Sequence, residues 1–430
     1  MDELGQGSGW HGATVPAVPG RRVPGRGCRS VAARDRIGGM PTVLRGPALV
    51  DDVITPSLVE IEGDRIVAVT PDPSPGTSPL ETEVDAEVTV VSGTMLPAYV
   101  DLHCHGGGGA AFTDLDADAA AAAARHHHRR GTTSLLASLV TMSPADLERG
   151  VAILADLADD GLVDGIHLEG PWIAEARCGA HDPALLRDAE RAEVDRLLEV
   201  GRGHVRQVTL APERTNGLEL VRWLTDAGVH AAVGHTTATY EQVGGAVEAG
   251  ADLATHLFNG MDPWHHRTPG AVPALLREAA RGGMTLELVA DGTHLADGTT
   301  ATVVDLVGPS RVAFVSDAMA AAGIGDGAYL LGGLPVVVTD GVARLERDPD
   351  GTAPGAIAGG TSHVGDIVAR AVRGGMPLPY AAQCGSRTPA ALLGLADRGT
   401  LRAGTRADIV IVDDAGTVQQ VMRAGRWLDA

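Results

Sequence analysis

Residue types that bind divalent metal ions recur along this chain at the ends of strand-like segments. They are His103 and His105 in YVDLHCHGGGG, Glu169 in GIHLEGPW, His235 in AAVGHTTATY, His256 in LATHLFNGM and Asp317 in VAFVSDAM. Imidazole and carboxylate groups are the ligands that Zn²⁺ and similar cations prefer. Parallel strands whose C-terminal ends all carry functional groups are typical of a (β/α)₈ barrel active site. The series therefore predicts a metal centre at the rim of a barrel.

The spacing within each motif supports this interpretation. His103 and His105 are two residues apart on a strand, so both side chains leave the same face. Glu169 ends an otherwise apolar strand, where a carboxylate is costly to bury unless it is paired or bound to metal. With His235 and His256 it forms a compact Glu–His–His set.

Asp317 has two interpretations. A carboxylate at the last strand end can accept a proton from the attacking water and deliver it to the leaving nitrogen. The same residue could instead cap the N-terminus of the following helix. Cys178 has no partner in its segment and is expected to be a free thiol that borders the site.

Several residues on loops after the strands are candidates for substrate contacts. His181 lies in RCGAHDP, His294 in ADGTH and Arg267 in HHRTPG. Each could be merely solvated. An arginine beside a metal site suits an anionic group through paired donors, and the backbone amides of Asn259 and Gly260 could add further donors.

The elements that must position these residues are apolar strand-like runs that alternate with helical segments. Eight runs are expected, around residues 95–103, 133–140, 163–169, 206–212, 230–235, 252–257, 286–291 and 312–317. This alternation predicts parallel βα units and an α/β fold, a (β/α)₈ TIM-like barrel over residues 95–394. A β-rich insertion is expected late in the barrel, near residues 327–358.

Short strand patterns at both ends of the chain predict a small flanking β-sandwich domain. Its first part is expected over residues 40–94 and its second over 395–430. Residues 1–39 are rich in Gly, Pro and Arg without hydrophobic periodicity. We expect them to be a disordered tail, or to lie upstream of a true start at Met40.

Composition excludes several function classes. The formal net charge of −21 disfavours nucleic acid and anionic membranes as partners. No uncharged apolar run reaches the ~18 residues of a membrane span, and no secretory signal is evident, so a reduced cytoplasmic location is expected. All 34 basic residues are arginine. The absence of lysine excludes Schiff-base catalysis and a carboxylated lysine between two metals, which leaves Glu169 as the candidate bridging ligand.

Taken together, these motifs resemble the amidohydrolase superfamily and, within it, the N-acetylglucosamine-6-phosphate deacetylase family. The matching stretches include LPAYVDLHCHGGGG, GIHLEGPW, GAHDP, GHTTATY, THLFNGM and SDAM, in family order over about residues 42–415. The resemblance implies that Glu169, His235 and His256 form the principal metal site. It implies that His103 and His105 form a second-metal pair found in some members.

The resemblance also implies roles for the remaining candidates. Asp317 would be the catalytic acid and base. His181 and His294 would contact the substrate, and His181 is also expected to act in catalysis by stabilising the oxyanion. Asn259, Gly260 and Arg267 would grip the phosphate, the arginine reaching across a homodimer interface. The expected reaction is hydrolysis of the acetamide of N-acetylglucosamine 6-phosphate, with no nucleic acid or membrane partner.

Alternatives remain open at this point. They are a deacetylase for another N-acetyl amino sugar phosphate such as N-acetylgalactosamine 6-phosphate, a D-aminoacylase-like enzyme, and a barrel that binds a sugar phosphate without chemistry. Zn²⁺ is the default cation for these ligands, as one or two ions per subunit, while Fe²⁺, Mn²⁺ or Co²⁺ would fit the same residues.

Overall fold

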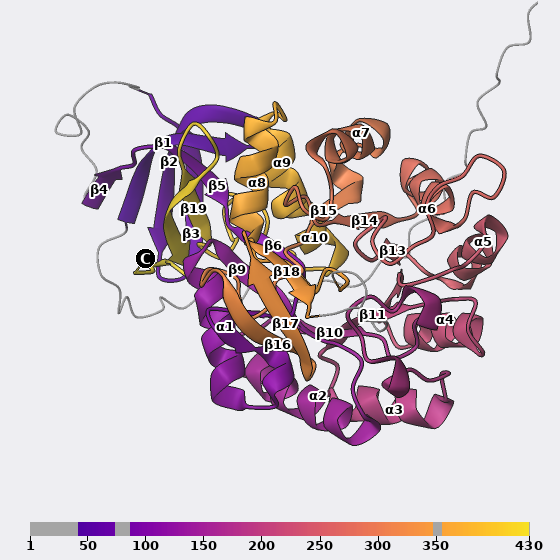
Figure 1. Ribbon diagram of the computed structural model, residues 1–430. Helices are drawn as coiled ribbons and strands as arrows, with labels where there is room; N and C mark the ends of the chain where they lie inside the picture. Colours follow the sequence, from indigo (N-terminus) through magenta and orange to yellow (C-terminus); the bar gives the residue numbers. More distant parts are fainter. Residues whose placement is uncertain (1–41, 74–86, 347–354, 430) are drawn as a thin grey trace, which may run out of the picture. The chain divides into compact units, whose positions relative to one another are not determined.

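Eight parallel strands form the centre of the computed structural model, which describes residues 42–73, 87–346 and 355–429 (Figure 1). The tail predicted over residues 1–39 and the alternative start at Met40 lie outside the described residues. In sheet order the strands are β6 (Tyr99–Cys104), β9 (Thr132–Leu139), β10 (Gly165–Glu169), β11 (Val205–Leu210), β12 (His230–Val233), β13 (Leu253–Ala254), β14 (Thr285–Leu288) and β15 (Val312–Phe314). The predicted α/β barrel fold is confirmed, and each expected run overlaps one of these strands.

The first and last barrel strands meet through the residues that follow β15. The backbone N–H of Asp317 donates to the carbonyl of His103 at 2.8 Å, and the Ser316 hydroxyl donates to Asp101 at 2.6 Å. An isolated bridge also joins Cys104 and Ala318. These bonds bring the end of the barrel sequence beside its beginning, so the residues around Asp317 and His103 share one rim.

Helices follow most barrel strands, and some of them begin at a residue whose side chain accepts a hydrogen bond from the first helical turn. In chain order they are α1 (Ala117–Arg129), α2 (Pro144–Asp159), α3 (Arg191–Val200), α4 (Gly217–Asp226), α5 (Tyr240–Ala249), α6 (Ala271–Ala280), α7 (Asp297–Val307), α8 (Val364–Arg373), α9 (Leu378–Gly385) and α10 (Arg387–Leu392). Asp116 caps α1, and Thr239 forms a capping box with Gln242 at the start of α5. Among the described residues, no helix is long and apolar enough to cross a bilayer.

A second sheet flanks the barrel and draws its strands from both ends of the described chain. Its order is β21 (Arg426–Trp427), β20 (Val418–Arg423), β19 (Ile409–Val412), β5 (Thr94–Pro97), β1 (Thr42–Val50), β2 (Val53–Glu62) and β3 (Arg65–Pro71), with β4 (Glu87–Val90) paired to β1. Figure 1 shows β19, in yellow, beside the indigo strands of the early chain. The expected flanking β structure from both ends of the sequence is therefore present.

Polar contacts tie this sheet to the barrel. Arg406 and Arg423 both donate to the carbonyl of Thr133, each at 3.2 Å. The Thr133 hydroxyl donates to Asp408 at 2.9 Å. Because Thr133 lies near the start of β9, these bonds fix the flanking sheet at the end of the barrel opposite the expected active site.

The late insertion forms a three-stranded antiparallel sheet of β16 (Gly327–Leu331), β17 (Leu334–Thr339) and β18 (Val342–Leu345). Part of the expected segment, residues 347–354, lies outside the described residues. The turn between β16 and β17 rests against the C-terminal end of β9. Gly332 has φ +57°, and a Cβ built on it would lie 2.4 Å from the Val140 side chain. Only glycine permits this close approach.

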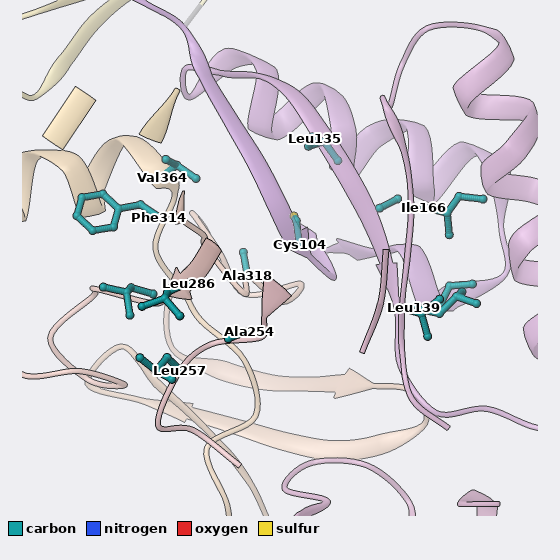
Figure 2. Packing of buried hydrophobic residues seen from close by; sticks show 14 of the residues in the cluster. Cys104, Leu135, Leu139, Ile166, Ala254, Leu257, Leu286, Phe314, Ala318 and Val364 are labelled. Carbon is teal, nitrogen blue, oxygen red and sulfur yellow. The ribbon is translucent and has the colours of Figure 1, made fainter. Parts of the chain in front are cut away.

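The hydrophobic core lies between the barrel strands and the surrounding helices. Leu135, Leu139, Ile166, Leu286 and Phe314 all belong to the main buried cluster, and Figure 2 shows them around the barrel wall. The cluster is rich in Ala, Val and Leu, in line with an aromatic content of 3%. Small, branched side chains therefore fill the spaces between strand and helix.

Replacing one buried and one exposed leucine by alanine tests where the hydrophobic core lies. Leu135 is fully buried in β9, whereas Leu306 in α7 is 61% exposed. We expect Leu135→Ala to lower the free energy of unfolding by about 2–5 kcal/mol, because it leaves a cavity. Leu306→Ala should change it by less than about 0.5 kcal/mol. Denaturant titration of both variants measures the difference, and equal effects would contradict this placement of the core.

Candidate active site

The predicted metal-binding residues lie together at the C-terminal rim of the barrel. His103 lies within β6, next to its last residue, and Glu169 is the last residue of β10. His235, His256 and Asp317 lie just beyond β12, β13 and β15, in the first residues of the loops. The sequence expectation that these side chains end strands therefore holds for Glu169, while three of the others lie slightly past the strand ends.

Those three residues share an uncommon backbone conformation. His235, His256 and Asp317 have φ values of 46°, 24° and 47°. Side chains other than glycine rarely adopt this left-handed region, which costs of order 1–3 kcal/mol per residue. The turn lets the chain leave the strand while the functional side chain stays directed toward the barrel mouth. Strain concentrated at these positions favours a functional role for them.

Glu169 joins two groups of histidines through its two carboxylate oxygens. Its Oε1 lies 3.0 Å from His235 Nε2 and 2.9 Å from His256 Nε2. Its Oε2 lies 3.2 Å from His105 Nε2 and 3.5 Å from His103 Nε2. Both sets offer atoms within 4.8 Å of one another, as ligands of a single ion do. Glu169 therefore occupies the position that a bridging carboxylate requires.

We call Glu169 and the four histidines around it the cluster. The hydrogen bonds that the outer nitrogens of the histidine rings make indicate which ring nitrogens direct lone pairs into it. His235 Nδ1 donates to the carbonyl of Arg177 at 2.6 Å, and His105 Nδ1 donates to the carbonyl of Ser138 at 3.2 Å. In the neutral ring each Nε2 is then an acceptor. Lone pairs that converge on a buried carboxylate require a positive charge between them. The donor set therefore fits a divalent cation.

The pKa shifts of Glu169 and His103 also indicate that positive charge is favoured at this position. Burial alone would raise the pKa of Glu169, but the interaction with His103 holds it well below its usual range. Burial opposes protonation of His103, yet Glu169 and Asp317 raise its pKa well above the usual value. The carboxylates thus attract either protons or a metal ion into the cluster. A cation with N and O ligands satisfies them without protonating the imidazoles.

Asp317 lies at the edge of this cluster and faces the pocket. Its Oδ1 is 3.3 Å from His105 Nε2, and its Oδ2 is 3.8 Å from His294 Nε2. Burial opposes ionisation of Asp317, but His103 and His105 lower its pKa from the ordinary value. The side chain is thus an ionised carboxylate at neutral pH, the form that a general base requires. No described helix begins at Asp317, so the helix-cap alternative is wrong.

His181 carries its ring proton on the side that faces the cluster. The backbone N–H of Thr141 donates to His181 Nδ1 at 3.1 Å, which makes Nδ1 an acceptor. Burial lowers the pKa of His181, so the neutral ring has its hydrogen on Nε2, 3.3 Å from Glu169 Oε2. The ring therefore presents an N–H donor where an oxygen bearing developing negative charge could be bound.

His294 is oriented by a carboxylate on its own loop. Its Nδ1 donates to Asp291 Oδ2 at 2.8 Å, and Asp291 Oδ1 accepts from the backbone N–H groups of Thr293 and His294. Burial opposes protonation of His294, but Asp291 and Asp317 raise its pKa. His294 Nε2 faces the pocket beside Asp317 and can contact a polar substrate group.

A pocket of about 240 Å³ opens above the cluster. Its polar lining includes His105, Glu169, His181, His294 and Asp317 together with Asn259 and Gly260, and apolar contacts come from Val140, Leu331 and Ile357. The structure thus brings nearly all of the predicted site residues to one cavity. Leu331 and Ile357 belong to the late insertion and the segment after it, so this part of the chain covers one side of the pocket.

Arg267 is the exception among the predicted substrate contacts. It is exposed on the loop after β13 and does not line the pocket; its guanidinium lies 2.8 Å from His266 Nε2. Cys178 is a partly buried free thiol, and the adjacent Gly179 lines the pocket. The buried His167 bonds to Ser138 and Thr209 at 2.9 and 2.8 Å, as expected for a hydrogen-bonded core histidine.

Sequence reasoning missed residues that support the site from behind. Glu213 accepts hydrogen bonds from the Thr236 hydroxyl and the Thr237 N–H at 2.5 and 2.6 Å, which fixes the loop after His235. Glu287 in β14 lies beneath the cluster and is fully buried. A single charged residue within the apolar run TLELVA was the available signal for Glu287.

Comparisons with known proteins agree with this arrangement. The profile of the amidohydrolase family matches residues 94–428. The N-acetylgalactosamine-6-phosphate deacetylase of Escherichia coli O157:H7 is 36% identical over 80% of this chain and 89% of its own length. The N-acetylglucosamine-6-phosphate deacetylase of Lysinibacillus sphaericus is 32% identical over 77% of this chain and 84% of its own.

A solved structure extends the similarity to three dimensions. It is a variant of the N-acetyl-D-glucosamine-6-phosphate deacetylase of Mycobacterium smegmatis, determined in complex with N-acetyl-D-glucosamine-6-phosphate. It superimposes with a TM-score of 0.82 and 41% identity over 90% of this chain and 98% of that one.

Proposed function

The chain belongs to the amidohydrolase family, and from this premise we propose that it hydrolyses the acetamide of N-acetylglucosamine 6-phosphate to glucosamine 6-phosphate and acetate. One observation carries the proposal: a single pocket joins a Glu–His cluster suited to a cation, an ionised Asp317 and an N–H donor on His181. Amide hydrolysis needs these three functions together.

The cation would be held by Glu169, His235 and His256, with His103 and His105 as ligands of a second ion. We propose Zn²⁺, because borderline cations favour mixed imidazole and carboxylate ligands. A divalent cation at this position supplies a Lewis acid toward the acetamide oxygen and lowers the pKa of water. Its ligands come from different strand ends, so the rigid barrel sets the geometry.

Asp317 is the group that moves protons in the proposed reaction. As an ionised carboxylate it accepts a proton from the attacking water and then protonates the departing sugar nitrogen. His181 Nε2–H donates to the carbonyl oxygen as that oxygen becomes negative, a contribution often worth several kcal/mol. His294, held by Asp291, contacts a polar group of the sugar. These three side chains surround the position where the amide must lie.

The phosphate does not react and serves to orient the substrate. We propose that the backbone of Asn259 and Gly260 binds it together with Arg267 of a second copy in a homodimer. The exposure of Arg267 outside its own pocket supports this arrangement. The net charge of −21 makes such a local cation necessary for an anionic substrate. A charged sugar phosphate does not cross membranes freely, so we propose a cytoplasmic location.

A second candidate substrate is N-acetylgalactosamine 6-phosphate. The 36% identity to the Escherichia coli O157:H7 N-acetylgalactosamine-6-phosphate deacetylase favours it. The two sugars differ only in the configuration of one ring hydroxyl, so the catalytic groups would serve both. Pocket residues away from the cation, such as Leu331 and Ile357, would set the preference.

Acetate release from three sugars tests the proposed substrate. We expect the highest kcat/KM for N-acetylglucosamine 6-phosphate, a lower value for its galacto epimer, and a value roughly 100-fold lower for unphosphorylated N-acetylglucosamine, because the phosphate contacts are lost. An enzyme-coupled acetate assay on the metal-loaded chain measures all three. A galacto preference would support the second candidate, and equal rates with and without phosphate would contradict both.

Asp317→Asn tests the proton-transfer role. The amide keeps the size of the carboxylate but does not accept a proton, so kcat should fall roughly 100- to 10,000-fold. Metal content should remain at the wild-type level, because Glu169 and the four histidines proposed as ligands are intact. Steady-state kinetics with elemental analysis of the same preparation gives both values. Wild-type turnover in this variant would remove Asp317 from the mechanism.

Arg267→Ala tests the proposed phosphate contact. KM for N-acetylglucosamine 6-phosphate should rise roughly 10- to 100-fold through loss of a charge-assisted contact. KM for the unphosphorylated sugar should not change. Arg281→Ala is a matched control, since Arg281 is an exposed arginine that follows the C-terminus of α6 and pairs with Glu278. The proposal fails if both sugars are affected equally, or if the control variant behaves like Arg267→Ala.

A further inference from the structure

Glu287 is a fully buried carboxylate that the proposed reaction does not use. It lies in β14 and points into the barrel beneath the histidine cluster. Among the described residues, its one ion-pair partner is His103; no arginine forms a salt bridge with it. A carboxylate buried without a cationic partner is costly, so its presence needs a compensating role.

Both oxygens of Glu287 accept hydrogen bonds. Oε1 accepts from the Gln207 side-chain amide at 2.6 Å. Oε2 accepts from His103 Nδ1 and from the backbone N–H of His256, each at 3.2 Å. Glu287 thus contacts one residue from each half of the cluster, a ring in one case and the backbone in the other.

The bond to His103 determines which ring nitrogen is free. An ionised carboxylate only accepts hydrogen bonds, so His103 Nδ1 must carry the hydrogen. The lone pair of the neutral ring is then on Nε2, which lies 2.9 Å from His105 Nε2 and 3.5 Å from Glu169 Oε2. The opposite tautomer would place a hydrogen in the cluster and block coordination.

His103 differs in this respect from the other cluster histidines. His105 and His235 are oriented by backbone carbonyls, and His256 Nδ1 has no hydrogen-bond partner among the described residues. Of these four rings, His103 is the one that a charged side chain from the described part of the chain orients. That carboxylate adds a negative charge close to His103 and His105, where it strengthens the attraction for a cation.

We propose that Glu287 is a positioning residue that selects the His103 tautomer and supplies the charge that retains a second divalent ion at His103, His105 and Glu169. The inference rests on the proposed metal-dependent function. It assigns Glu287 no contact with the substrate. The ion at Glu169, His235 and His256 depends on it less, because among these three ligands the Glu287 side chain contacts only the backbone N–H of His256 and none of the ligand side chains. The backbone bond from Leu257 to the Glu287 carbonyl at 2.9 Å is kept when the side chain is replaced.

The test is a metal-binding measurement on the full chain, independent of any sugar. Wild type, Glu287→Leu and Glu287→Gln are stripped with a chelator and titrated with Zn²⁺ against a chromophoric competitor, and bound zinc is counted by elemental analysis. We expect two ions per wild-type chain. In Glu287→Leu the ion at His103, His105 and Glu169 should bind roughly 10- to 100-fold less tightly. The affinity for the ion at Glu169, His235 and His256 should stay within a few-fold of wild type.

Glu287→Gln keeps the size of the side chain and separates charge from shape. Gln207 now donates its side-chain N–H to Glu287 Oε1, so its amide must turn over for its Oε1, which has no partner among the described residues, to accept from the introduced amide. The introduced carbonyl could then still accept from His103. We therefore expect the second ion in this variant to bind with an affinity between those of wild type and Glu287→Leu.

Asp164→Asn is the matched control for removing the charge of a partly buried carboxylate away from the cluster. Asp164 accepts from the Leu135 N–H at 3.1 Å just before β10, away from the rim. This variant should keep both ions even if its melting temperature falls. One ion in the wild type, a Glu287→Leu variant that holds both ions at wild-type affinity, or loss of both ions together would each overturn the inference. Deacetylation is assayed separately, so a wrong substrate assignment would not alter these results.

Discussion

The buried carboxylate of Glu169 requires a positive charge beside it, and the arrangement of the site follows from this requirement. Glu169 is nearly inaccessible to solvent, and the atoms around it are imidazole nitrogens rather than arginine or lysine groups. A cation that brings these nitrogens and oxygens together resolves the conflict, which otherwise would draw protons onto the rings. The left-handed backbone at His235, His256 and Asp317 follows from the need to direct each side chain toward that charge.

The backbone of the barrel determines the chemical state of the surrounding histidines. Carbonyls of Arg177 and Ser138 accept from His235 and His105, so those rings turn lone pairs toward the centre. The N–H of Thr141 donates to His181, so that ring turns a hydrogen toward it instead. One residue type thus serves as ligand or as hydrogen-bond donor according to the backbone group behind it. Such fixed dipoles need no reorganisation during a reaction.

The groups proposed for chemistry and those proposed for substrate selection come from different parts of the fold. The former lie at strand ends held by the barrel hydrogen bonds, whereas Leu331, Ile357, Asn259 and Gly260 lie on a hairpin and on loops. Loops can change without disturbing strand geometry. Under the proposed roles, such a separation is consistent with relatives named for N-acetylglucosamine and N-acetylgalactosamine 6-phosphates that match this chain over most of its length.

The sequence alone determined the barrel and the types of residue at its rim. Apolar runs that alternate with helical segments predict parallel strands flanked by helices. His, Glu and Asp at the ends of these runs indicate a functional site, because a polar or charged side chain is costly to bury unless it is paired or bound to metal. The tertiary structure alone decided which ring nitrogen faces the centre, that Arg267 stays outside its own pocket, and that Glu287 lies beneath His103. These depend on hydrogen bonds between residues far apart in the chain, such as Thr141 with His181 and His103 with Glu287. Local sequence periodicity carries no record of such pairings, because it reports only the face on which a side chain lies.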